Sequence, residues 1–151
     1  KIRNIITWFG VPNVTSNQET IQTLVKLIKP KEWDIFVDLW AGEWHVLASI
    51  ANSFPTIKCI GYELAPKAYS KAMKYKQSIA WEYKILNQNF FKADLSNASH
   101  IYCYLMPHMM PKLRKKLRKE CSPGTKLYIN AFPIPKKTPE TQIWTIYIYT
   151  I

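Results

Sequence analysis

An aspartate, a glycine and a glutamate stand at the spacing that a nucleotide-binding site requires. Asp38 and Gly42 lie in the stretch VDLWAGEWH, in which a buried apolar run ends in an acid and is followed by a tight turn and a helix. Peptide N–H groups in such a turn can face a ligand directly, and glycine permits both the close approach and a positive φ. Glu63 ends the next apolar run, about twenty residues later, where a carboxylate can accept hydrogen bonds from both ribose hydroxyls. The pattern therefore predicts a nucleoside cofactor bound near the two acids.

Each acid alone also has a simpler explanation. Asp38 could cap the helix that follows it, and Glu63 could be a solvated strand end. Their order and spacing favour a shared role instead. An acid at the end of the first strand differs from the G-x-G-x-x-G of dehydrogenases. It is typical of the D-x-G-x-G-x-G loops that bind S-adenosylmethionine.

The elements that must position these acids follow from alternating β-rich and helical patterns, which indicate βαβ units. A capping box at Ser16 and Glu19 predicts a helix that ends before Pro30. We therefore expect an α/β, Rossmann-like doubly wound fold, with a mostly parallel sheet, helices on both faces and an antiparallel C-terminal strand. It forms a single domain over 1–151, with an entry segment and helix at 1–30 and the core at 34–151. The strands are expected at 34–39, 57–64, 83–89, 100–106, 125–132 and 143–151, and the further helices at 45–52, 66–75 and 111–120, with a loop at 133–140.

Composition narrows the class of protein. The 151 residues are 48% hydrophobic, which excludes a disordered chain, and no apolar run is long enough to span a bilayer. Cys59, Cys103 and Cys121 are isolated, which favours buried reduced thiols in a cytoplasmic protein over disulfides or a metal site. The net charge of +11 fits nucleic acid, an anionic membrane surface or an acidic partner, although an AT-rich genome also produces it. The chain begins at Lys1, so we expect a missing upstream segment, and an anchor there would place the protein at the membrane surface.

Five ordered motifs resemble the class I (seven-β-strand) methyltransferases, and within them the small archaeal and bacterial protein-lysine methyltransferases. Mitochondrial relatives of these enzymes modify the ATP synthase c-subunit and the ADP/ATP carrier. The stretch VPNVTSNQET resembles the family's entry segment, although both prolines that flank its T-P turn are absent. VDLWAGEWHVLASIA is similar to VDLGAGEGHVLASIA, and GYEL to G-[YV]-E-[LI]. The fourth motif is NQNFFKADLSNASHIYCYLMP, and the fifth is MMPKLRKKLRKECSPGTKL with its P-G-T turn.

The resemblance implies S-adenosylmethionine as the cofactor and a protein substrate with a target lysine. It implies that Tyr104 and Pro107, together with Leu105, line the mouth where the methyl donor and the lysine amine meet, with Tyr104 positioning the amine. No residue is placed as an essential base, so we expect solvent to deprotonate the amine. The cofactor contacts that it implies are Ser16, Asp38, Leu39, Trp40, Ala41, Gly42, Glu63, Leu64, Asn89, Phe90 and Leu105.

Tryptophan stands at three positions where the family pattern has glycine, namely Trp33, Trp40 and Trp44. One cause would explain all three: the codon UGA, read as tryptophan in some genetic codes and as glycine in others. The low count of 4 glycines and the high count of 6 tryptophans agree with this hypothesis. Trp8, Trp81 and Trp144 are further candidates. Divergence to an inactive enzyme and deliberate mutation are the alternatives.

Two other functions remain open on the same fold, because a fold does not fix its substrate. One is methylation of RNA or a small molecule, in which the basic stretch Lys112–Lys119 tracks phosphates. The other is a non-catalytic basic binding domain that has lost its cofactor loop. A solvated helix face is the simpler explanation of the basic stretch. The sequence is silent on oligomeric state.

Overall fold

The computed structural model describes residues 5–6, 12–13, 17–42, 44–77 and 82–151. The elements follow in the order β1 (Ile5–Ile6), β2 (Pro12–Asn13), α1 (Gln18–Leu27), β3 (Ile35–Asp38), α2 (His45–Ser53), β4 (Lys58–Tyr62), α3 (Pro66–Gln77), β5 (Lys84–Leu86), the 3-10 helix η1 (Phe90–Lys92), β6 (His100–Cys103), the 3-10 helix η2 (Pro107–Met109), α4 (Met110–Glu120), β7 (Lys126–Asn130), β8 (Thr141–Ile143) and β9 (Ile146–Thr150). No helix within these ranges is long and apolar enough to cross a membrane.

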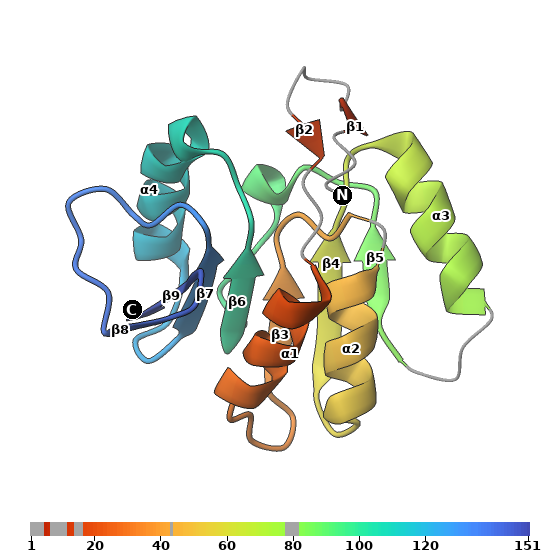
Figure 1. The fold of residues 1–151 in the computed structure, drawn as a ribbon, viewed down its shortest axis with the longest axis horizontal. Helices are drawn as coiled ribbons and strands as arrows, with labels where there is room; N and C mark the ends of the chain where they lie inside the picture. Colours follow the sequence, from red (N-terminus) through yellow and green to blue (C-terminus); the bar gives the residue numbers. More distant parts are fainter. Residues whose placement is uncertain (1–4, 7–11, 14–16, 43, 78–81) are drawn as a thin grey trace.

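One sheet carries the fold, with the strand order β5-β4-β3-β6-β7-β9-β8. The strands from β5 to β7 are parallel, whereas β9 runs antiparallel to both β7 and β8. The chain builds outward from β3 to β5 and then returns to β6 on the other side of β3 (Figure 1). The crevice outside the carboxyl ends of β3 and β6 is therefore the place where a sheet of this kind binds ligands. The predicted doubly wound fold is confirmed.

Two separate cores cover the two faces of the sheet, because successive strand side chains point to opposite sides. Phe36 of β3 packs in one core, with Leu24 of α1 and Leu47 of α2. Val37, the next residue, packs in the other core with Leu113 of α4. Helices therefore lie on both faces, as predicted. In Figure 1, α1 and α2 lie in front of the middle strands, while α3 flanks the edge strand β5.

Gly61 in β4 lets the loop after β3 and helix α2 approach the sheet closely. A Cβ atom at this position would clash with Leu47 Cδ1 and would lie 2.7 Å from the Cβ of Ala41. The absence of a side chain at Gly61 therefore fixes how near the Asp38–Gly42 turn can come to β4.

Two predicted elements need correction. The stretch 143–151 is not one strand: β8 and β9 form a hairpin that turns at Trp144, whose φ is 58°. The prediction lacked β8 because nothing in the sequence there signals a turn. Helix α1 is capped by Asn17, whose Oδ1 accepts a hydrogen bond from the Thr20 amide at 2.8 Å. Ser16, the predicted cap, lies outside the described residues.

Candidate active site

The two predicted acids lie at neighbouring strand ends and bind the backbone of the same loop. Asp38 ends β3, and its Oδ1 accepts a hydrogen bond from the Trp40 amide at 3.1 Å. Glu63 follows β4; its Oε2 accepts from the Gly42 amide at 2.8 Å and its Oε1 from the Ala65 amide at 2.7 Å. Both acids are 1% exposed. The carboxylates thus fix the turn between β3 and α2 from both sides.

Burial changes the protonation of this pair. Burial raises the pKa of Asp38 to about 7, the Trp40 amide opposes the rise, and the negative charge of Glu63 adds to it. Burial also raises the pKa of Glu63, against the lowering effect of the amides of Ala65 and Gly42. The influence of Glu63 on Asp38 places the two acids in one electrostatic environment, as the sequence pattern requires.

A cavity of about 310 Å³ opens beside this loop. The rings of Trp40 and Phe90 are tilted relative to each other, with centroids 6.5 Å apart. The centroids of Phe90 and Phe91 lie 4.2 Å apart. Of the predicted cofactor contacts, the cavity is lined by Leu39, Trp40, Leu64, Asn89 and Phe90. Aromatic and aliphatic walls with amide groups at the rim suit a flat heteroaromatic base. Apart from Trp40, the residues that line the cavity therefore fit the adenine part of S-adenosylmethionine.

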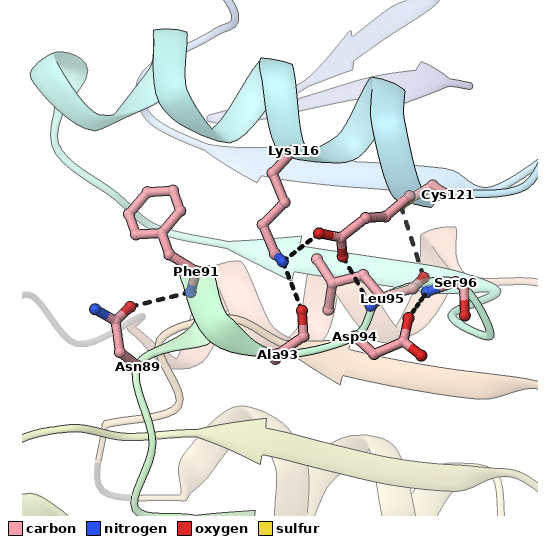
Figure 2. Close-up of polar contacts among 9 residues, drawn as sticks. Asn89, Phe91, Ala93, Asp94, Leu95, Ser96, Lys116 and Cys121 are labelled. Carbon is pink, nitrogen blue, oxygen red and sulfur yellow. Dashed lines mark hydrogen bonds and ion pairs between the residues drawn. The ribbon is translucent and has the colours of Figure 1, made fainter.

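Asn89 holds the entrance to this cavity in shape. Its Oδ1 accepts a hydrogen bond from the Phe91 amide at 3.0 Å and so caps η1, which carries Phe90 (Figure 2). The expected contact of Asn89 with the adenine side would thus come from a residue that also orders the aromatic wall.

The other predicted site residues do not line this cavity. Ala41 and Gly42 are buried in the turn behind it, and Leu105 is buried in the core on the α4 face. Tyr104 is half-buried and packs near Phe132, with ring centroids 6.5 Å apart. Pro107 is exposed and begins η2, whose next two residues reach the cavity. Ser16 lies outside the described residues.

Sequence reasoning missed six residues of the lining. They are Tyr62, Gln88, Phe91, His108, Met109 and Lys112. The first three lie within the quoted motifs, directly beside predicted residues, so including the chain neighbours of each predicted contact would have found them. The last three come from η2 and the first turn of α4, which only tertiary packing brings over the cavity.

The two described histidines near β6 have different environments. His100 is buried at the amino-terminal end of β6, where Nε2 lies 2.9 Å from Asp34 Oδ2 and Nδ1 lies 3.2 Å from the hydroxyl of Tyr128. This edge of the sheet is opposite the loop, so His100 has a structural role. His108 instead lines the cavity and is exposed.

The tryptophans of the loop point to different places. The indole of Trp40 forms part of the cavity wall. The indole of Trp44 stacks on Tyr75 of α3 at 4.6 Å and lines a separate groove along α1 and α2. Trp44 caps α2 without a side-chain hydrogen bond, at a φ of 104°. Only Trp40 therefore occupies space in the cavity that fits the base.

The doubly wound sheet and the loop at its switch point are shared with the class I, S-adenosylmethionine-dependent methyltransferases. The chain belongs to the family described as the ANTKMT methyltransferase domain, which it matches over residues 38–141. The predicted family, activity class and cofactor are confirmed.

Individual relatives differ in the substrates that their names give. A protein-lysine N-methyltransferase of Saccharolobus islandicus (strain REY15A) is 26% identical, over 93% of this chain and 94% of that protein. The solved structure of an RNA methyltransferase from Salinibacter ruber, in complex with S-adenosyl-L-homocysteine, is 25% identical with a TM-score of 0.81, over 91% of this chain and 94% of that one. A histone-lysine N-methyltransferase of Drosophila melanogaster, specific for H3 lysine-79, is 32% identical over 85 residues, which are 50% of this chain and 5% of that protein.

Proposed function

We propose that this chain transfers a methyl group from S-adenosylmethionine to the side-chain amine of a lysine in a protein substrate. The observation that carries the proposal is the end-to-end similarity to a protein-lysine N-methyltransferase. The shorter match to a histone-lysine enzyme supports the same substrate class. When bound, S-adenosylmethionine supplies an electrophilic methyl group on sulfonium, which an amine takes by in-line displacement.

The chain's own residues orient the reactants and exclude water. Glu63 and Asp38 hold the turn rigid through the amides of Gly42 and Trp40, and a fixed geometry lowers the entropic part of the barrier. Phe90 and Leu39 form apolar walls that keep solvent from one side of the cavity.

Tyr104 has the properties of a positioning residue rather than a base. Burial raises the pKa of its phenol, so it is neutral near neutral pH and can accept a hydrogen bond from the amine through its oxygen. A lysine has a reference pKa of about 10.4 and arrives mostly protonated. We place the removal of this proton in solvent, before the amine enters the site.

We place the reaction in a reducing compartment such as the cytoplasm. All three cysteines are buried and unpaired, and burial raises the pKa of Cys59 to about 12, which keeps its thiol protonated and unreactive. Attachment to a membrane surface through an upstream segment is the alternative for its location.

A transfer assay tests the substrate class directly. The chain, and a variant with Trp40→Gly and Trp44→Gly, would be incubated with radiolabelled S-adenosylmethionine and a cell lysate. We expect label in protein, removed by protease and resistant to ribonuclease, with methyl-lysine identified by mass spectrometry. Label removed by ribonuclease would favour the RNA alternative, which the similarity to an RNA methyltransferase also supports. No incorporation by either form would favour a non-catalytic binding domain.

A further inference from the structure

A second groove lies on the outer side of α4, and we call it the basic groove. It is lined by Pro111, Lys112, Arg114, Lys115, Arg118, Pro135 and Lys136 and encloses about 680 Å³. Five of these seven residues are cationic, and none of the lining residues is acidic. A concave surface of one charge sign raises the local concentration of an oppositely charged partner.

Hydrogen bonds hold the two walls of the basic groove together. Arg114 Nη1 donates a hydrogen bond to the Pro135 carbonyl at 3.3 Å, which ties α4 to the loop before β8. The loop is itself anchored by the Ile134 amide, which donates to the Tyr149 hydroxyl at 3.0 Å. These hydrogen bonds therefore connect the two walls of the groove to the folded core.

The acids nearest in sequence to the groove are committed elsewhere. Glu120 of α4 points inward and pairs with Lys116 at 2.6 Å, and Glu140 beyond the loop pairs with Lys126 at 3.2 Å. Neither glutamate lines the groove, so these two acids leave its positive charge uncompensated.

The basic groove reaches the cofactor cavity through a shared residue. Lys112 lines both, and its Nζ lies 4.3 Å from the centroid of the Phe91 ring. A segment lying along the groove would therefore lead to the mouth of the cavity.

We propose that the basic groove binds an acidic segment of the protein substrate that flanks the target lysine. The proposal rests on the proposed lysine methylation. A chain of net charge +11 repels a cationic lysine, and acids next to that lysine offset the repulsion and fix its register. A single-stranded nucleic acid fits the groove less well, because such sites combine cations with aromatic rings for base stacking, and none of the groove's lining residues is aromatic.

Peptide binding tests the groove without depending on catalysis. Two fluorescent peptides share a central lysine, flanked by glutamates in one and by glutamines in the other. Fluorescence anisotropy is expected to give about tenfold tighter binding of the acidic peptide at low salt, because several exposed charge pairs form together. The preference should decline as salt is added.

Charge reversal in the groove should remove that preference. We expect Lys115→Glu with Arg118→Glu to abolish the discrimination between the two peptides. The matched control, Lys67→Glu with Lys74→Glu on the exposed side of α3, changes the net charge equally and should keep it. Circular dichroism would establish that both variants fold.

The outcomes separate this proposal from the proposed function. Equal affinity for the two peptides overturns the proposal that the basic groove binds an acidic segment. The same loss of discrimination in the groove and control variants also overturns it. Displacement of the acidic peptide by polyuridylate at lower concentration than by unlabelled peptide overturns it in favour of nucleic acid. Specific binding of the acidic peptide without methyl transfer by the Trp40→Gly, Trp44→Gly form supports the groove and counts against lysine methylation.

Discussion

At the scale of single residues, the backbone conformation at the tryptophan positions is the most informative feature of this chain. Of the four tryptophans that the structure describes, Trp33, Trp44 and Trp144 have φ values of 68°, 104° and 58°. A left-handed backbone costs a non-glycine residue about 1–2 kcal/mol. Gly42 and Gly124 also have a positive φ, without this cost. At positions 33 and 44, the glycine of the family pattern and the positive φ of the backbone agree. At position 144, the positive φ alone indicates a glycine. We infer that glycine is the residue for which these positions are shaped.

Replacing Trp144 by glycine should stabilise the protein. The side chain is 58% exposed in the β8–β9 turn, so little burial is lost. Relief of the left-handed strain, less the greater entropy of glycine in the unfolded chain, should raise the free energy of unfolding by about 0.5–1 kcal/mol. Urea denaturation measures the change.

The neighbouring residue provides the control for this substitution. Ile143 is also exposed but lies in strand β8 without a positive φ, so Ile143→Gly should destabilise by about 1 kcal/mol. Equal losses in both variants would contradict the assignment of glycine to position 144. The source DNA gives a separate check, since UGG at codons 33, 40 and 44 would refute the UGA hypothesis.

Trp40 should limit binding of the cofactor. Its indole lies in the cavity wall opposite Phe90, where a glycine would leave room for the nucleoside. We expect the chain with tryptophan at position 40 to bind S-adenosylmethionine weakly or not at all, and Trp40→Gly to restore binding in calorimetry. Trp44→Gly alone should mainly relieve strain, because that indole stacks on Tyr75 outside the cavity. Identical affinity with tryptophan or glycine at position 40 would count against this account.

At the scale of elements, one buried lysine ties α4 to the segment that carries the aromatic wall. Lys116 is 9% exposed, and its Nζ donates to the Ala93 carbonyl at 2.5 Å and to Glu120 Oε1 at 2.6 Å. Glu120 Oε2 accepts from the Leu95 amide at 3.1 Å, and the Cys121 thiol donates to the Leu95 carbonyl at 3.8 Å (Figure 2). The segment after η1 is thus held along its backbone by the inner face of α4.

Removing that tether should weaken both the fold and the cavity. Lys116→Met keeps an unbranched apolar side chain but removes Nζ and leaves the Ala93 carbonyl without its partner, at a cost of about 2 kcal/mol in unfolding free energy. Affinity for S-adenosylmethionine should fall as well, because Phe90 begins the same segment. The exposed Lys119→Met is the control, with a change below about 0.5 kcal/mol. Thermal denaturation and calorimetry compare the two; indistinguishable variants would show that the tether is dispensable.

The elements also show where prediction from the sequence succeeds. The strands near 35–38 and 58–62 were predicted because continuous apolar runs mark buried parallel strands. The β8–β9 turn was missed because a tryptophan stands where a glycine would have signalled it. At the candidate site, the spacing of Asp38 and Glu63 predicts that the two acids meet, and both bind the loop after β3. The sequence does not indicate Lys112 and His108, because they reach the cavity only through the packing of η2 and α4.

At the scale of the whole molecule, the fold defines the chemistry but not the substrate. Relatives named for protein lysine and for RNA are about equally similar, at 26% and 25% identity. The shared sheet and loop therefore explain methyl transfer, while surfaces outside them must select the substrate. The basic groove is such a surface.

The pH dependence of folding should report the buried acid at the end of β3. Burial raises the pKa of Asp38 from 3.8 to about 7, so the folded protein binds this proton more tightly than the unfolded chain. The contribution of Asp38 to stability is therefore full below about pH 4 and declines as pH rises through 7. With about 1.4 kcal/mol for each pKa unit, the decline is on the order of 4 kcal/mol.

Asp38→Asn isolates this contribution, because asparagine keeps a carbonyl oxygen for the Trp40 amide but has no proton to lose. We expect the variant to gain stability relative to the parent as pH rises from 4 to 8, in denaturation series at matched ionic strength. Groups whose pKa is lowered, such as Asp34, act in both proteins and cancel in the difference. A difference that is constant across this range would mean that Asp38 stays ionised in the folded protein.

Catalysis should have a different pH profile, set by the substrate. If solvent removes the proton of the lysine amine, kcat/KM follows the fraction of neutral amine and rises about tenfold for each pH unit well below its pKa of about 10.4. His108 is exposed and is the histidine among the described residues that line the cavity. If solvent removes the proton, His108→Gln should leave this slope intact. Initial rates between pH 7 and 9 with the Trp40→Gly form and a lysine peptide measure it. A shallow slope together with a much slower His108→Gln variant would contradict this expectation. His108 of η2, rather than water, would then remove the proton from the amine.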